Sequence, residues 1–200
     1  MLIGNAREAE GKLQQSLGHS ESADAFAYLG KAKMQLGKTA EAEANWTSAV
    51  RQNNESRIAR EGLAELAMQQ GQFSKALEWL KPLENEPDLK SSTAFLLQRT
   101  YALLKDPDNA ERWKREVERL RKLEDMRVNM EQVIVNSPDS MWAQVFQSYL
   151  LAEQGNRGQA AEVVAPFVKD DSPEFLKLLW QSLQDGSPLP ALDKVPMELF

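Results

Sequence analysis

Apolar and small residues recur at helical spacing through the first half of the chain, in short stretches separated by turns. Gly37 and Gly71 each stand at the end of one such stretch, where a helix closes with the left-handed backbone that glycine adopts most easily. The spacing predicts two pairs of helices and the first helix of a third, over residues 23–36 with 39–52, 56–70 with 73–85, and 90–104.

The same kinds of residue return every 34 positions. Shifting the chain by 34 residues aligns Leu29 with Leu63 and Leu97, and Ala42 with Ala76 and Ala110. The shift also places Gly37 on Gly71, Gly30 on Ala64, Trp46 on Leu80 and Ala49 on Leu83. A fixed period of this length indicates a stack of equivalent units, each of which buries its apolar side against its neighbours. We therefore expect the aligned Leu and Ala residues to be buried, together with Trp46 and Leu80.

The first full unit contains Phe26, Leu29, Gly30, Gly37, Ala42, Trp46 and Ala49. These residues and their spacing resemble the tetratricopeptide repeat (TPR) family, in which aromatic, Leu-Gly, Gly, Ala and aromatic positions recur over 34 residues. Lys33 and Asn54 depart from the Tyr and the closing Pro that are usual in the family. The resemblance implies an all-α fold, a right-handed solenoid of helical hairpins.

The second half of the chain departs from this period. Residues 108–135 contain neither Gly nor Pro and predict one over-long helix, with a break near Asp125 as the alternative. Residues 173–184 place several apolar side chains on one helical face and predict a C-terminal capping helix. A fourth helical pair is predicted between them, because Ala160, Val164, Pro166 and Phe167 repeat the spacing of Ala76, Leu80, Pro82 and Leu83.

The predicted organisation is one repeat domain over residues 1–186, followed by an extended, proline-containing tail over 187–200. Its first segment resembles the second helix of a repeat without the first, which favours a cut from a longer array over an N-terminal cap. We therefore expect the C-terminal part of a longer bacterial-type TPR protein, whose open half repeat exposes Leu2 and Ile3 for self-association. The domain divides into the half repeat 5–17, the repeats 23–56, 57–90, 91–135 and 138–169, and the cap helix 173–184.

Composition narrows the chemistry further. The 200 residues carry a net charge of −6, which argues against a nucleic-acid partner. There is no Cys and a single histidine, His19, so we expect no metal site. The chain has no phosphate-binding glycine loop, zinc-protease helix or nucleophile elbow, and we expect neither an enzyme nor a bound cofactor. No apolar run is long enough for membrane insertion, and the compartment, cytoplasmic or exported, stays open.

The resemblance implies a scaffold that binds a peptide or helix of a partner protein in the concave groove lined by the first helix of each pair. One alternative is an architectural module of a larger enzyme or of a secretion or assembly machine, which docks on its own chain. Another is an ordinary solvated face without a ligand. Ala27, Lys31 and Gly62 fill three positions of the family's carboxylate clamp, so that clamp is absent. By the family's pattern the candidate contacts are Lys31, Met34, Glu61, Glu65, Met68, Phe95 and Arg99.

The fourth pair adds an apolar stripe to these candidates. Trp142, Val145 and Tyr149 share one helical face, and Trp and Tyr are enriched among the residues that dominate binding energy. An exposed stripe of this kind would mark a contact site for a partner. The alternative is that the over-long helix, through Met126 and Met130, or the tail folds back and covers the stripe.

Overall fold

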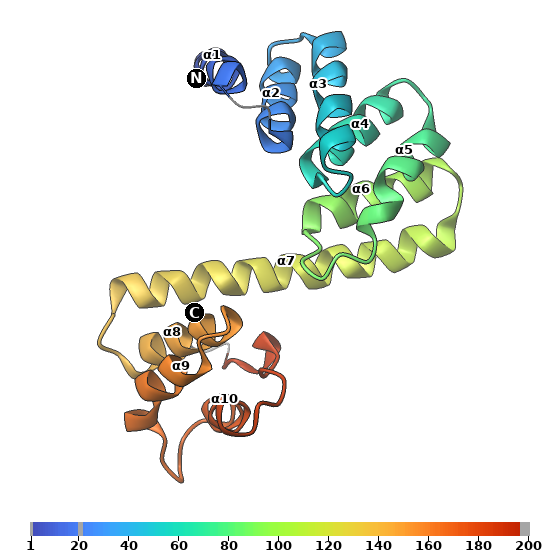
Figure 1. The fold of residues 1–200 in the computed structure, drawn as a ribbon. Coiled ribbons are helices and arrows are strands. Elements are labelled where there is room, and N and C mark those ends of the chain that lie inside the picture. The colour runs from blue at the N-terminus through green and yellow to red at the C-terminus, as the bar shows by residue number, and fades with distance from the viewer. Residues whose placement is uncertain (1, 20–21, 197–200) are drawn as a thin grey trace. The chain divides into compact units, whose positions relative to one another are not determined.

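The computed structural model describes residues 2–19 and 22–196, with side chains over 5–18 and 22–196. Within these ranges the chain is helical and has no strand, which confirms the predicted all-α fold (Figure 1). The sequence predicted one domain over 1–186, whereas the chain forms two compact units, Met1–Leu120 and Arg121–Phe200. The α-helices are α1 (Leu2–His19), α2 (Ala23–Gln35), α3 (Thr39–Gln52), α4 (Arg57–Gln69), α5 (Phe73–Leu80), α6 (Ser91–Leu103), α7 (Pro107–Asn136), α8 (Met141–Glu153), α9 (Arg157–Val164) and α10 (Glu174–Asp185).

Unit 1 consists of packed helical pairs. α2 packs on α3 and α4 packs on α5, while the first half of α7 contributes Trp113 and Val117 to the core beneath α6. Short 3-10 turns extend α5 (Lys81–Leu83) and α9 (Ala165–Phe167), where Pro82 and Pro166 stand. The aligned Leu and Ala residues, Trp46 and Leu80 are buried as predicted, except for Ala110. Ala110 is only partly buried, because it lines an open hollow with Ala102 and Lys114.

Trp46 joins the first two repeats. Its ring is 3 % exposed, and its Nε1–H donates to the carbonyl oxygen of Ala27 at 3.1 Å. Two glycines make room for the ring: a Cβ added at Gly30 would lie 2.5 Å from the indole, and one added at Gly62 would lie 2.4 Å from it. α2 and α4 can therefore both approach α3 closely, which fixes their positions relative to each other.

The turn after each first helix takes left-handed backbone. Gly37 has φ of 75°, Gly71 of 73° and Gly155 of 86°, as the glycine pattern predicted. The third repeat places Lys105 at the corresponding position, with φ of 59°. A side chain with a Cβ is strained in this conformation, so the third turn keeps the geometry of the first two at a local cost in stability.

Replacing Lys105 with Gly is therefore expected to raise the free energy of unfolding by about 0.5–1 kcal/mol. Relief of roughly 1–2 kcal/mol of left-handed strain is partly offset by the greater freedom of glycine in the unfolded chain. Urea unfolding followed by circular dichroism measures the difference. Lys105→Ala retains the Cβ, so it is the matched control and should change little. If the glycine variant unfolds at a lower urea concentration than the wild type, the interpretation that the Lys105 backbone is strained is wrong.

The N-terminal helix α1 packs on α2, as expected of a half repeat. Ala6 is 2 % exposed, Ala9 and Leu13 are partly buried, and Glu10 pairs with Lys38 at 2.8 Å. The side chains of Leu2 and Ile3 lie outside the described residues. Self-association through this edge therefore stays a prediction.

Unit 2 contains the second half of α7 together with α8, α9 and α10. The over-long helix is confirmed as one element of 30 residues, without the alternative break near Asp125. The first helix of the fourth pair begins at Met141 and not at residue 138, because the Ser140 hydroxyl caps it by accepting from the Ala143 N–H at 3.2 Å. The predicted cap helix is α10, which begins at Glu174 and packs on α8 and α9.

The predicted extended tail belongs, as far as residue 196, to the packed part of unit 2. It contains a 3-10 turn, Leu192–Lys194, and the side chains of Leu192 and Val195 are 4 % and 2 % exposed. Arg157 holds the start of the tail, because its Nη1 donates to the carbonyl oxygens of Ser182 at 2.6 Å and Ser187 at 3.0 Å. Residues 197–200 of the predicted tail lie outside the described residues.

Candidate partner-binding surface

Three first helices of unit 1 lie next to one another. α4 packs against both α2 and α6, and the second helices α3 and α5 pack on α2 and α4 respectively. We call the solvent-exposed side of α2, α4 and α6 the first-helix face. The sequence predicted seven contacts on it, and six of them contribute to the surface.

Four of these six residues are exposed and two are partly buried. Lys31 on α2, Glu65 on α4 and Arg99 on α6 are exposed, and Phe95, one turn before Arg99, is 43 % exposed. Met34 and Glu61 are partly buried. The face is thus a mixture of both signs of charge with one large apolar ring, and each first helix contributes to it.

Met68 is the predicted contact that does not lie on this face. Its side chain is 6 % exposed and belongs to the core that α4 shares with α6 and α7. The Thr100 hydroxyl contacts the Met68 sulfur at 3.4 Å. Because α6 packs over this part of α4, the position that the repeat pattern assigns to the groove is covered here.

The acidic side chains of α4 have different surroundings. Glu61 Oε1 accepts from the hydroxyls of Ser92 at 3.0 Å and Thr93 at 2.5 Å, which ties α4 to the start of α6. The surrounding protein desolvates the Glu65 carboxyl and raises its pKa. The nearby Glu61 carboxylate raises the pKa of Glu65 further, whereas Arg99 and Lys31 lower it. Glu65 is therefore within electrostatic reach of charged groups on all three helices.

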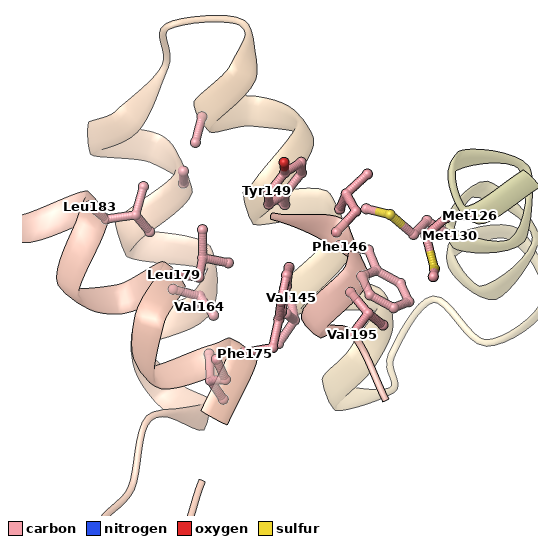
Figure 2. Close-up of a cluster of buried hydrophobic side chains, with 14 residues drawn as sticks. Met126, Met130, Val145, Phe146, Tyr149, Val164, Phe175, Leu179, Leu183 and Val195 are labelled. Carbon is pink, nitrogen blue, oxygen red and sulfur yellow. The ribbon is translucent and has the colours of Figure 1, made fainter. Parts of the chain in front are cut away.

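The stripe predicted on the fourth pair is not a free surface. Val145 is fully buried, Tyr149 is 6 % exposed, and Trp142 is partly buried. The ring of Phe175, on α10, lies 5.8 Å from that of Tyr149 between centroids. Met126 and Met130 of α7 complete the same core (Figure 2).

In unit 2, other segments of the same chain thus cover the stripe, which was the alternative to a partner-binding site. Trp142, Val145 and Tyr149 are corrected from contact residues to core, because α10, α7 and the tail all supply apolar side chains to that side of α8. Burial, with a further contribution from Glu153, raises the pKa of Tyr149 to about 12, while Arg127 opposes the rise. The candidate surface is therefore confined to unit 1.

Among the described residues, no group of three or more His, Cys, Asp or Glu side chains could hold a metal ion. Arg60 is buried and has a structural role, since its guanidinium donates to Asn54 and to the carbonyl oxygen of Trp79 at 3.1 Å. Among the described helices, none has the length and apolar character needed to cross a membrane.

Tyr28 is a surface aromatic that the repeat pattern did not single out. It is 49 % exposed on α2, three residues before Lys31, and residues at this spacing share a helical face. The family's groove positions omit it, because they select the residue before it, Ala27, which is 1 % exposed. The sequence signal that could have identified Tyr28 is a large aromatic residue one turn before an exposed Lys.

Comparison with known proteins agrees with the helical geometry. Residues 28–85, which run from α2 into the turn after α5, match the family model described as tetratricopeptide repeat. A search of curated proteins and a search of solved structures found no match. Repeats of this kind are generally protein–protein interaction modules. Residues 28–85 therefore form a tetratricopeptide-repeat segment of this chain.

Proposed function

We propose that the first-helix face of unit 1 binds a segment of a partner protein. The observation that carries this proposal is the exposure of two large aromatic side chains on first helices, Tyr28 on α2 and Phe95 on α6. Each lies within one turn of an exposed cation, Lys31 or Arg99. Exposed aromatic area beside charged groups has the composition of a protein-binding surface, and aromatic and Arg residues dominate binding energy at such surfaces.

The rigid support of this face favours binding. Trp46 fixes α2 and α4 on α3, and the hydrogen bonds of Glu61 fix α4 on α6. Side chains displayed on helices that are already held in place lose little further freedom when a ligand binds. A preorganised surface therefore retains more of its contact energy as affinity.

The test selects peptides that bind the full chain from a random phage-displayed library and measures their affinities by fluorescence anisotropy. Phe95→Ala is expected to weaken the selected peptides at least tenfold, as truncation of a central aromatic contact does at other interfaces (a loss of about 1.4 kcal/mol or more). Tyr28→Ala is expected to weaken them in the same direction. Both side chains are exposed, so the melting temperature should change little.

Glu78→Ala is the matched control, because Glu78 is exposed on α5, outside the first-helix face. It should leave affinity unchanged. Selected peptides that bind Phe95→Ala and Tyr28→Ala as tightly as the wild type, or that lose affinity with Glu78→Ala, would place the binding surface elsewhere.

A further inference from the structure

Three charged residues of the first-helix face occupy one position of the repeat. Lys31, Glu65 and Arg99 are separated by 34 residues each, and they lie on α2, α4 and α6. α4 packs against both neighbours, so the order of charge across the face is positive, negative, positive. All three side chains are exposed. We call these residues the charge row.

The members of the charge row are not neutralised by one another at close range. In the part of the chain that the structure describes, none of the three forms a hydrogen bond or a close ion pair. Other charges on the same helices do have partners: Lys33 pairs with Glu41 at 2.8 Å, and Glu61 accepts two hydroxyl hydrogen bonds. Lys31, Glu65 and Arg99 are thus exposed ionic groups of this face that can pair with a ligand.

The spacing of the charge row constrains what can pair with it. Axes of packed helices are about 8–10 Å apart. An extended chain advances about 3.3–3.6 Å per residue, so three residues span about 10 Å. A segment that crosses α2, α4 and α6 in extended form therefore meets one charge of the row at every third residue.

We infer that the occupant of the first-helix face is an extended protein segment with acidic, basic and acidic side chains at every third residue, which pair with Lys31, Glu65 and Arg99. The inference rests on the proposed function and specifies the chemistry of its partner. The central pair contributes most, because the Glu65 carboxylate is partly desolvated and gains more from an added cation than a fully hydrated carboxylate does.

The experiment uses two synthetic nine-residue peptides with identical Ala and Tyr residues at the uncharged positions. One has Asp at positions 2 and 8 and Arg at position 5; the other has Arg at positions 2 and 8 and Asp at position 5. Fluorescence anisotropy at low salt should show that the full chain binds the first peptide at least about tenfold more tightly. The net charge of the protein, −6, favours the second peptide, so this preference cannot come from overall charge.

The matched protein carries Lys31→Glu, Glu65→Lys and Arg99→Glu together. It should prefer the second peptide, with an unchanged helical circular dichroism spectrum because the three side chains are exposed. About 1 M salt should narrow the preference of both proteins, since the screening length then falls to about 3 Å. A preference for the first peptide in both proteins, no preference in the wild type, or no binding of either peptide would overturn the inference.

The experiments distinguish a failure of the charge-row inference from a failure of the proposed function. If the designed peptides fail while Phe95→Ala still weakens the phage-selected peptides, the binding face stands and the charge row is not its recognition element. If Phe95→Ala and Tyr28→Ala leave the selected peptides unaffected, both proposals fall.

Discussion

Replacing Trp46 with Ala is expected to lower the free energy of unfolding by about 3–5 kcal/mol, as removal of a buried large aromatic ring does. The ring is 3 % exposed, fills the space beside Gly30 and Gly62, and donates to the Ala27 carbonyl oxygen. Its removal leaves a cavity between two glycines and eliminates the hydrogen bond from the indole to the Ala27 carbonyl oxygen. Chemical unfolding followed by far-ultraviolet circular dichroism measures the loss.

Gly62 provides the matched test of the same contact. In the wild type, Gly62→Ala should be destabilising by about 1–3 kcal/mol, because the added Cβ would lie 2.4 Å from the indole. In the Trp46→Ala background the same change should be stabilising by about 1 kcal/mol, since alanine is the better helix former and the obstructing ring is gone. Equal effects of Gly62→Ala in the two backgrounds would contradict the close packing of α4 on Trp46.

Replacing Tyr149 with Ala is expected to destabilise the protein by about 3–5 kcal/mol, comparable to truncation of a buried Phe. Tyr149 is 6 % exposed in the core of unit 2, with the Phe175 ring 5.8 Å away between centroids. Urea unfolding followed by circular dichroism, with thermal melting as a second measure, reports the change. The expected effect is large because Tyr149 is buried. The same burial excludes Tyr149 from the candidate surface.

Tyr149→Phe is the control for this second prediction. It keeps the ring and removes only the hydroxyl, for which the described residues provide no hydrogen-bond partner, so stability should change by less than about 0.5 kcal/mol. If Tyr149→Ala instead unfolded at the same urea concentration as the wild type, the residue would be a surface contact, as in the partner-binding alternative that the sequence left open.

The first-helix face and the α8 stripe show what the repeat pattern could predict of the site. Lys31, Glu65 and Arg99, which the pattern assigns to the groove side of their helices, are exposed, because α2, α4 and α6 retain the regular order of helical pairs. Met68 follows the same pattern and is nevertheless buried, since α6 covers it. Periodicity assigns a residue to a side of its helix, but it does not say whether another element covers that side.

The sequence by itself determined the helices, their pairing and the turns between them, because these depend on residues close together in the chain. The 34-residue recurrence of Leu, Ala and Gly predicted the contacts of neighbouring helices, and the absence of Gly and Pro predicted the length of α7. The left-handed turn at Lys105, by contrast, lacks a glycine, and the structure was needed to reveal it.

Only the tertiary structure decided which helical faces meet water. The contact of Tyr149 with Phe175, the place of Met130 in the same core, and the burial of Leu192 and Val195 depend on segments far apart in the chain. No periodic pattern encodes such contacts, because an apolar stripe is equally suited to bury itself against its own chain or against a partner. The free energy of burying apolar area is nearly independent of where the covering surface comes from, so packing and not sequence spacing confined the candidate surface to unit 1.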